Sequence, residues 1–360
     1  MPASTNPGGS PMVSIVVPAY NAARFLRQSL DSIVGQTYSN REILFMDDGS
    51  TDETEAIARS YGDRIVYHRQ PRNRGQFPNV DDGIALARGE YIAVYHSDDI
   101  YHPEIVAKEV EFLERHSQVA AVFAMHIFIN AEGNEWGRLR LAPEIPVGVP
   151  VAYESILNTI LCYKNRIFPA PSSMVRASVY REKAPYRGRE YPVTADFEMF
   201  FRIARDYPVG LLGEHLFRYR WGHGNADQLD RMLRTAPEAY FAIMDEHLAA
   251  PGAKGRARAE SLTAHEAHRG EDAVIRAVNC YIMKRLAEMP AILGETSPAR
   301  LLASNKIERY RMTVLYVALE ILARMPYIPA VGRAFRSRWY RHVSDAVIEK
   351  ALLAQRRIAS

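Results

Sequence analysis

Short runs of β-branched and aromatic residues alternate with helical patterns over the first hundred positions of the chain. Four such runs lie at residues 13–17, 43–46, 65–67 and 91–95. Their composition is that of buried parallel strands. Between the first two, apolar residues recur at the spacing of one helix face from Phe25 to Val34. Strands that alternate with helices over short connections indicate βαβ units, so we predict an α/β fold with a mostly parallel central sheet flanked by helices.

After the fourth strand the alternation loosens. Residues 119–129 form a strand-like run that is followed by the hairpin turn signal Asn130–Asn134. Residues 131–195 are rich in Pro, Gly and Arg, which favours loops around a site, and helical periodicity returns at 196–206. From about Asp227 onward Ala, Leu, Arg and Glu dominate, which predicts helices.

The chain is therefore expected to have three parts. Residues 1–11 are a disordered lead, residues 12–226 form the α/β domain, and residues 227–360 form a helical C-terminal region. Within the α/β domain we divide a first half, 12–130, from a second half, 131–226. A chain of 360 residues has room for about two domains.

Composition excludes several classes of protein. Forty-five Lys and Arg against 42 Asp and Glu give a net charge of +3, which argues against a nucleic-acid partner because phosphate neutralisation needs a basic excess. Cys162 and Cys280 are too few and too far apart for a disulfide framework. No apolar stretch approaches the length of a membrane span and no signal pattern opens the chain. We expect a cytoplasmic protein.

Three polar clusters follow the predicted strands. They are Tyr20-Asn21, Asp47-Asp48-Gly49-Ser50 and Ser97-Asp98-Asp99. Ligands bind open α/β sheets at the carboxyl ends of parallel strands, so the three clusters are expected to converge on one edge.

The acidic pairs allow two interpretations. Asp98 and Asp99 repel each other unless a cation lies between them, and Mg²⁺ or Mn²⁺ takes such oxygen ligands. Alternatively, Asp99 caps a helix that begins near Pro103. The Asp47-Asp48 pair could form an ordinary strand-to-helix turn, and Ser50 with Glu53 has the spacing of a capping box, which predicts a helix start there.

Several long motifs, in order, resemble those of the inverting family-two glycosyltransferases. They are Val13–Asn21, Ser29–Thr37, Glu42–Asp52, Asn73-Arg-Gly75, Asn79, Ala87–Ile92 and Ser97–Asp99. The resemblance covers roughly residues 12–226 and implies a GT-A fold. It makes 12–130 the nucleotide-sugar-binding half and 131–226 the acceptor-binding half.

The resemblance also implies roles for matching residues in donor binding. Asp48 would accept a hydrogen bond from the base, Asp98 would contact the ribose or the sugar, and Asp99 would ligate the metal that holds the diphosphate. The other donor-binding positions are Pro18, Ala19, Tyr20, Asn21, Asn73, Gly75 and Asn79. The family's usual Asp-x-Asp is here Ser97 followed by an Asp pair, so the division of roles between Asp98 and Asp99 stays open.

The catalytic base that the resemblance implies is Asp196, followed by an apolar helix. Ala195 replaces the Glu that is commoner in the family. The alternative is that Asp196 and Glu198 are solvated carboxylates at a helix N-terminus. His223, in a stretch similar to the family's Tyr-Arg-x-His, could ligate the metal or contact phosphate, or be a loop histidine.

An acceptor pocket would include Ser172, Ser173 and Arg176, which stand where relatives line that pocket. The alternative is that these residues form a polar turn before a helix.

The C-terminal region has a local charge excess. Across residues 306–341, eight Lys and Arg face two Glu, a net +6, interleaved with apolar and aromatic residues. This composition is that of an element on an anionic membrane surface. The alternative is a helix that packs on the catalytic domain or on a second copy of the chain.

The sequence thus predicts a metal-dependent inverting glycosyltransferase that uses Mn²⁺ or Mg²⁺. We expect a nucleoside-diphosphate sugar as donor, with a UDP-sugar favoured, and a saccharide or lipid-linked acceptor in surface polysaccharide or glycoconjugate synthesis. The enzyme would then work in the cytoplasm at the inner face of the membrane. The alternatives are a nucleotidyltransferase-like enzyme, whose Gly/Arg/Lys-rich triphosphate loop is missing after the first strand, and a non-catalytic nucleotide-sugar-binding or scaffolding protein.

Overall fold

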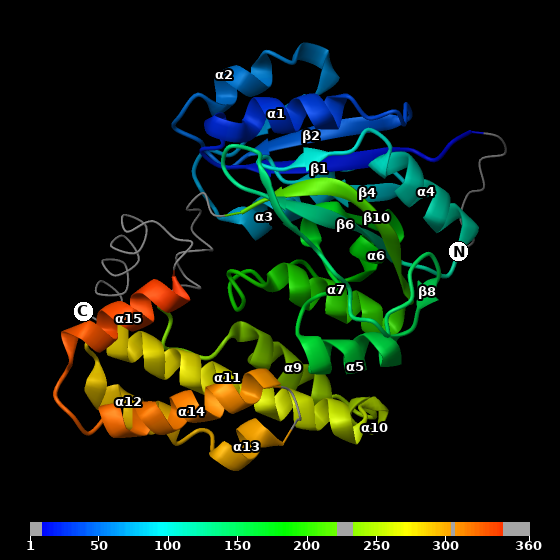
Figure 1. Cartoon of the computed structure of the whole chain (residues 1–360). Helices are drawn as coiled ribbons and strands as arrows, with labels where there is room; N and C mark the ends of the chain where they lie inside the picture. The colour runs from blue at the N-terminus through cyan, green and yellow to red at the C-terminus, as the bar shows by residue number, and fades with distance from the viewer. Residues whose placement is uncertain (1–8, 222–232, 304–306, 341–360) are drawn as a thin grey trace. The chain divides into compact units, whose positions relative to one another are not determined.

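The computed structural model describes residues 9–221, 233–303 and 307–340, and these form two compact units (Figure 1). The first unit comprises Met1–Ile156 and Asn165–Trp221, and the second comprises Leu157–Lys164 and Gly222–Ser360. The division after Trp221 is five residues before the boundary that the sequence predicted. No sequence pattern indicated that Leu157–Lys164 belongs with the second unit.

One ten-stranded sheet forms the centre of the first unit, in the order β3-β2-β1-β4-β9-β6-β10-β5, with β7 beside β6 and β8 beside β10. Strands β1 to β4 are parallel to one another, and β6 pairs in parallel with β10. Strand β9 pairs antiparallel with both β4 and β6. The main strands are β1 (Val13–Ala19), β2 (Arg41–Asp47), β3 (Val66–Arg69), β4 (Tyr91–Val94), β6 (Ala121–Ile129), β9 (Ser173–Arg176) and β10 (Val209–Arg220). The short ones are β5 (Ile100–Tyr101), β7 (Glu135–Arg138) and β8 (Pro150–Val151).

Helices cover both faces of this sheet, and alternate residues of β1 show how. Ile15 and Val17 pack in one core with residues of α1, α2 and α4, whereas Val16 lies against Gly83 of α3 on the other face. Phe123 of β6 contacts Phe200 of α7 on that second face (4.9 Å between ring centroids). The helices are α1 (Ala23–Val34), α2 (Thr54–Arg59), α3 (Gln76–Leu86), α4 (Ile105–Arg115), α6 (Ala177–Glu182) and α7 (Ala195–Asp206).

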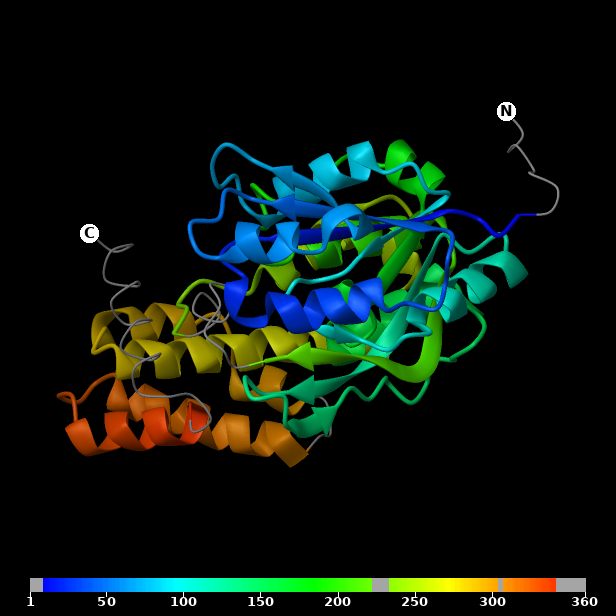
Figure 2. The same ribbon diagram turned by 90° about the horizontal axis from the view of Figure 1, so that it is seen from above.

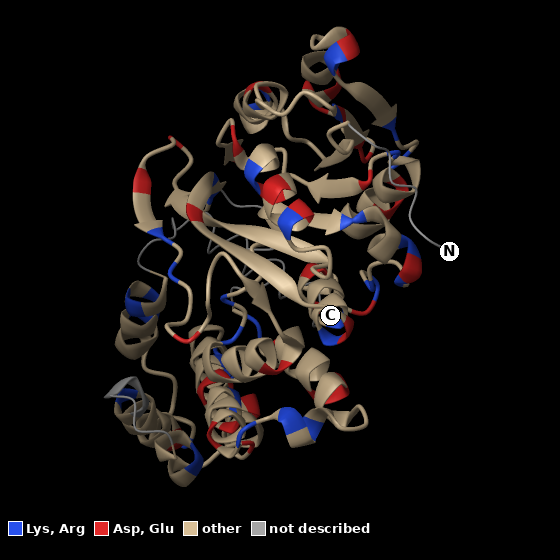
Figure 3. Ribbon diagram, turned by 90° about the vertical axis from the view of Figure 1, so that its right-hand side faces the viewer, with Lys and Arg blue, Asp and Glu red and all other residues tan. Residues whose placement is uncertain are grey.

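Charged residues are distributed as this layering requires. Strands β1, β4 and β6 contain no Lys, Arg, Asp or Glu, and most of the charged residues in Figure 3 lie on helices, loops and strand ends. A strand that is buried on both faces cannot place a charge in water, so it reads as a continuous apolar run. This is the pattern from which the α/β fold was predicted, and the prediction is confirmed.

The segment 131–195 differs from its prediction as a loop region. It contains α5 (Tyr153–Tyr163), β9 and α6 as well as loops. Ile156, Leu157, Ile160 and Leu161 of α5 are fully buried at helical spacing. The hairpin at Asn130–Asn134 is confirmed, because the Asn130 side chain accepts the backbone N–H groups of Glu132 and Asn134 between β6 and β7.

The described part of the second unit is helical, as predicted. Its long helix α11 contacts α12, α13, α14 and α15 and contributes buried residues from Ala273 to Ile282 to their shared core. The bounds of the helices are α9 (Ala239–Ala249), α10 (Ala253–Arg256), α11 (Ala259–Ile282), α12 (Met289–Leu293), α13 (Pro298–Leu302), α14 (Ile307–Leu322) and α15 (Pro329–Trp339). Among the residues that the structure describes, no helix is long and apolar enough to cross a bilayer.

Candidate active site

The three polar clusters meet at one edge of the sheet, as predicted. Strands β2, β1 and β4 are parallel neighbours, with Ala19 beside Asp47 and Val16 beside Val94, so the loops that follow them leave the same edge. Strands β6 and β10 end at this edge too, since β10 is parallel to β6 and both run in the direction of β4. Five strands therefore direct their carboxyl ends toward one place.

The two aspartates after β2 have different environments. Asp47 is fully buried, accepts the backbone N–H of Ser50, and receives the Tyr67 hydroxyl at 2.6 Å. Asp48 accepts the backbone N–H groups of Arg74 and Gly75, one on each carboxylate oxygen, both at 2.8 Å. Burial raises the pKa of Asp48, and these two amides oppose that rise. Asp47 thus shapes its own turn, whereas Asp48 joins the turn to a second loop.

Gly49 allows these two loops to approach each other. Its φ is +75°, and a Cβ added there would lie 2.9 Å from the backbone carbon of Arg72. No side chain can occupy that space without moving the backbone that Asp48 binds.

We expect Gly49→Ala to destabilise the protein by more than the 1–2 kcal/mol or so that a left-handed φ costs alone, and to weaken nucleotide binding. Gly62 is a matched control, because its φ of +58° is similar but an added Cβ would meet nothing within 4 Å. Urea unfolding and nucleotide titration of both variants check this. Equal losses for Gly49→Ala and Gly62→Ala would show that the loop contact is unimportant.

The loop after β1 is fixed to the loop after β2. Asn21, at a φ of +49°, donates its N–H to the Ser50 hydroxyl and accepts the N–H of Thr51 on its side chain. Helix α2 begins only at Thr54 and has no side-chain cap. The prediction that Ser50 caps a helix was wrong, because its hydroxyl binds Asn21 instead.

The remaining donor-binding candidates lie around this loop pair. Pro18 and Ala19 end β1, and Tyr20 is about half exposed. The Asn73 side chain accepts the N–H of Gly75. Asn79 is buried and donates to the carbonyl of Met46, while its Oδ1 has no partner in the described part of the chain.

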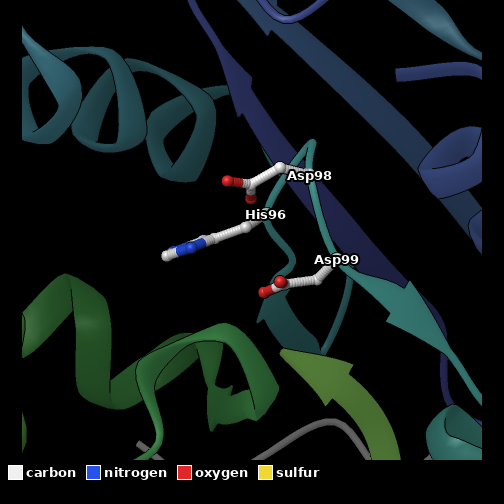
Figure 4. Close-up of side chains that lie close together, drawn as sticks. All are labelled: His96, Asp98 and Asp99. Carbon is white, nitrogen blue, oxygen red and sulfur yellow. The ribbon is translucent and has the colours of Figure 1, made fainter. Parts of the chain in front are cut away.

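A candidate metal site follows β4. His96, Asp98 and Asp99 each offer one ligand atom, and these atoms lie within 4.8 Å of one another. Figure 4 shows the three side chains directed to the same side of the loop. His96 was not among the ligands predicted from the sequence, which were Asp99 and His223. The available signal was a histidine two positions before the pair at a strand end.

The buried carboxylate of Asp99 fits a cation. Its Oδ1 accepts the N–H of Arg220 at 2.8 Å, and its buried Oδ2 has no hydrogen-bond partner among the described residues. Burial and the neighbouring carboxylate of Asp98 raise the pKa of Asp99 well above its usual range. An imidazole nitrogen and carboxylate oxygens are ligands of first-row divalent metals. The residues present therefore suit a divalent cation.

Arg220, at the end of β10, is hydrogen-bonded to the loop that contains Asp98 and Asp99. It is 2% exposed, and its Nε donates to the carbonyl of Asp98 at 2.9 Å. Its other guanidinium nitrogens donate to the carbonyls of Asn130 and Ala131 and to the side chain of Gln28. Sequence reasoning did not assign Arg220 this role. A buried arginine needs hydrogen-bond acceptors for its N–H groups, and these four oxygens supply them.

Asp196 lies in the first turn of α7. That helix ends at Asp206, and β10 begins three residues later, at Val209. Because β10 then runs to the edge that carries the polar clusters, the last turn of α7 lies near the start of β10 and the first turn lies toward that edge. Asp196 is partly exposed and accepts the N–H of Phe197. Glu198 is not solvated, contrary to the alternative reading, because it is 2% exposed and ion-paired with Arg202.

Asp81 joins helix α3 to the loop that precedes α7. It accepts the N–H of Tyr186 at 3.2 Å, and burial raises its pKa to about 6. An acid whose pKa is raised on folding is destabilising when ionised, so this penalty is complete above about pH 6 and disappears below the unfolded pKa of about 4.

We expect Asp81→Asn to be more stable than the wild type at about pH 7.5, with the gain shrinking toward about pH 4.5. Urea unfolding across this pH range measures it. Asp82→Asn is the control, because Asp82 is ion-paired with Arg74 at the surface and gives no such gain. A gain for Asp81→Asn that is independent of pH would refute this account of its burial.

The acceptor candidates are placed differently from one another. Ser173 pairs with Val94, so it lies at the carboxyl end of β4, and Ser172 beside it bonds to both backbone groups of Ala124. Arg176 pairs with Tyr91 at the other end of β4, and its guanidinium donates to the carbonyls of Val119, Leu113 and His116. The structure does not bring Arg176 to the site. His223 lies outside the described residues.

Solved structures resemble this fold. TarS 1–349 of S. aureus in complex with UDP-GlcNAc aligns with a TM-score of 0.58 over 93% of both chains at 15% identity. The Pyrobaculum calidifontis mannosyltransferase PcManGT, in complex with GDP-Man and Mn²⁺, aligns with a TM-score of 0.52 over 96% of this chain and 87% of that one, also at 15% identity. The chain has the GT-A fold.

Sequence comparison assigns the family. Residues 14–183 match glycosyl transferase family 2. An uncharacterized glycosyltransferase of Haemophilus influenzae is 31% identical over 220 residues, which is 60% of this chain and 67% of that protein. EpsE of Bacillus subtilis, named as a glycosyltransferase, is 30% identical over 216 residues, 58% of this chain and 73% of that protein. The chain belongs to glycosyl transferase family 2.

The match to some relatives is only partial. An uncharacterized glycosyltransferase of Rickettsia felis is 29% identical over 202 residues, which is 55% of this chain and 32% of that protein. The chain thus aligns with about a third of that relative's length.

Proposed function

We propose that the protein is a metal-dependent inverting glycosyltransferase that transfers a sugar from a nucleoside-diphosphate sugar to a hydroxyl acceptor. The observation that carries this proposal is the cluster of His96, Asp98 and the buried Asp99 in the loop after β4, at the edge where β1 and β2 also end. The buried Asp99 has one carboxylate oxygen without a hydrogen-bond partner among the described residues, which suits a bound cation. The relatives that bind UDP-GlcNAc or GDP-Man make such a donor the expected ligand.

The loops after β1 and β2 would hold the nucleotide. Asp48 is fixed by two backbone amides, and each of its oxygens retains a lone pair with which to accept an N–H of the base. Tyr20 follows β1, is about half exposed, and offers a ring for stacking. Asn73, Gly75 and Asn79 would shape the adjoining wall. A UDP-sugar remains the favoured donor.

His96, Asp98 and Asp99 would hold a divalent cation. When bound, it would supply charge neutralisation and Lewis-acid assistance to the departing diphosphate. Arg220 keeps the loop in place through the carbonyl of Asp98.

Asp196 would act as the general base. It takes the proton of the acceptor hydroxyl while that oxygen bonds to the anomeric carbon, on the face opposite the bond to the diphosphate that breaks. Its position in the first turn of α7 places the carboxylate at the positive end of a helix dipole, which favours its ionised form. Ser172 and Ser173, near the carboxyl end of β4, are the candidate residues for binding the acceptor. The acceptor would be a saccharide or a lipid-linked molecule in surface polysaccharide or glycoconjugate synthesis.

His96 makes a prediction about the metal. An imidazole ligand suits transition metals better than Mg²⁺, so the wild type is expected to prefer Mn²⁺ to Mg²⁺, and His96→Asp to lower that preference by on the order of tenfold. Electron paramagnetic resonance of free Mn²⁺, with Mg²⁺ as competitor, measures it without turnover. His102→Asp, an exposed histidine outside the cluster, is the control. An unchanged preference in His96→Asp would remove His96 from the ligand set.

The reaction itself is tested with a panel of nucleotide-sugars and Mn²⁺. We expect one donor to be hydrolysed slowly without acceptor, and proton NMR of the first product to show the anomer opposite to that of the donor. A product with the donor's configuration would contradict the inverting mechanism, and no turnover of any donor with any acceptor would favour a binding protein.

A further inference from the structure

Helix α14 of the second unit has apolar residues on two opposite faces. Its inner face is accounted for, because it packs into the core that α11 organises. The inner residues are Met312, Leu315, Tyr316, Leu319 and Leu322. The outer face is the unexpected one.

The outer face carries a continuous row of exposed apolar side chains, which we call the α14 stripe. It consists of Tyr310, Val314, Val317, Ile321 and, in the turn after the helix, Met325, with exposed fractions of 57, 70, 48, 55 and 43%. The spacings of four, three and four residues keep the helical members on one face. Single exposed apolar residues are ordinary, but a row of five marks a surface that another apolar phase covers.

Helices α14 and α15 carry an excess of positive charge. Residues 310–340 contain five arginines and one acidic residue, Glu320, which pairs with Arg324 at 3.0 Å. Arg311 and Arg324 stand exposed near the two ends of the stripe, and Arg333 and Arg338 are exposed on α15. Both α14 and α15 pack on α11, and Figure 2 shows them along one margin of the second unit.

We propose that the α14 stripe and the arginines of α14 and α15 form a docking surface for an anionic lipid bilayer. The positive charge favours a lipid bilayer over a second copy of the chain as the partner of this surface. A second copy of this surface would bring like-charged arginines together, whereas lipid headgroups supply the negative charge that matches them. A helix of this kind lies in the plane of the interface with its apolar face among the acyl chains and its arginines at headgroup level. This inference does not rest on the proposed activity.

Sedimentation of the full chain with vesicles tests the proposal. We expect binding to phosphatidylglycerol-containing vesicles, little binding to phosphatidylcholine alone, and a several-fold decrease between about 0.1 and about 0.5 M NaCl. Val314→Glu and Ile321→Glu are each expected to weaken binding about tenfold or more. Leu86→Glu changes an exposed leucine of the first unit and is expected to bind as the wild type does. Thermal unfolding confirms that each variant is folded, which is expected because these side chains are exposed.

Three outcomes would overturn the proposal. They are no binding to anionic vesicles, equal binding by the stripe variants and the wild type, and equal weakening by Leu86→Glu. Sedimentation velocity without lipid tests whether a second copy of the chain covers the α14 stripe instead. A dimer that Val314→Glu converts to a monomer, together with no vesicle binding, would make the α14 stripe a contact between copies of the chain.

Discussion

Asp196→Asn is expected to lower sugar transfer about 100- to 10,000-fold, because a positioned general base contributes a rate factor of that size. Asparagine has the same shape and can still accept the N–H of Phe197, so the start of α7 is retained. Donor affinity is expected to stay near that of the wild type, since the proposed role of Asp196 concerns the acceptor proton. Initial rates with a saturating donor, together with a separate titration of the nucleotide, measure both effects.

The same helix offers a control for this prediction. Asp206 ends α7 and forms surface ion pairs with Lys183 and Arg205. Asp206→Asn makes the same chemical change at the opposite end of the helix and is expected to leave transfer unchanged. If Asp196→Asn and the wild type turn over equally, Asp196 is not the base.

Arg220→Met is expected to destabilise the protein by roughly 3 to 5 kcal/mol, because it removes the hydrogen bonds of the guanidinium to the carbonyls of Asp98, Asn130 and Ala131. The side chain is nearly fully buried and also stacks on Phe25, with its guanidinium carbon 4.4 Å from the ring centroid. The same change frees the loop of Asp98 and Asp99, so cation-dependent nucleotide binding is expected to decrease as well. Urea unfolding and nucleotide titration at low denaturant separate the two effects.

Arg218, two residues earlier on β10, provides the comparison. Its side chain is about half exposed and pairs with Glu135 at 3.2 Å. Exposed pairs of this kind contribute about 1 kcal/mol or less, so Arg218→Met is expected to be nearly neutral. A similarly small effect of Arg220→Met would mean that the loop holds its shape without the buried guanidinium.

The parallel half of the sheet could be predicted because each of its strands is marked by a short apolar run in the sequence. The runs 13–17, 43–46 and 91–95, which form most of β1, β2 and β4, are apolar except for Ser14, as burial on both faces requires. The insertion of β9 between β4 and β6 could not be predicted. Its partners are about 80 and 50 residues earlier in the chain, and nothing within residues 173–176 specifies them. The membership of Leu157–Lys164 in the second unit is likewise a long-range packing effect.

The candidate site could be predicted at the level of loops but not of atoms. The topological rule for ligand sites brought the polar clusters of β1, β2 and β4 to one edge. It could not distinguish Asp47 from Asp48, because adjacent identical residues differ only in the hydrogen bonds that the folded loops offer them. The contact of Arg220 with the carbonyl of Asp98 joins residues more than 120 positions apart, so no local pattern predicts it. His96 was missed because the family motif placed the candidate nitrogen ligand at His223, whereas the fold brings His96 next to Asp98 and Asp99.

The central claim is that a divalent cation at His96, Asp98 and Asp99 joins a nucleoside diphosphate to this edge of the sheet. Calorimetric titration with UDP and with GDP, with and without Mn²⁺, tests it without any knowledge of the acceptor. For the wild type we predict that Mn²⁺ tightens the binding of one of these nucleotides at least about tenfold, or about 1.4 kcal/mol. For Asp99→Asn, which still accepts the N–H of Arg220, we predict no effect of the cation. Wild-type protein that binds neither nucleotide, or binds one equally well with and without Mn²⁺, would contradict the account.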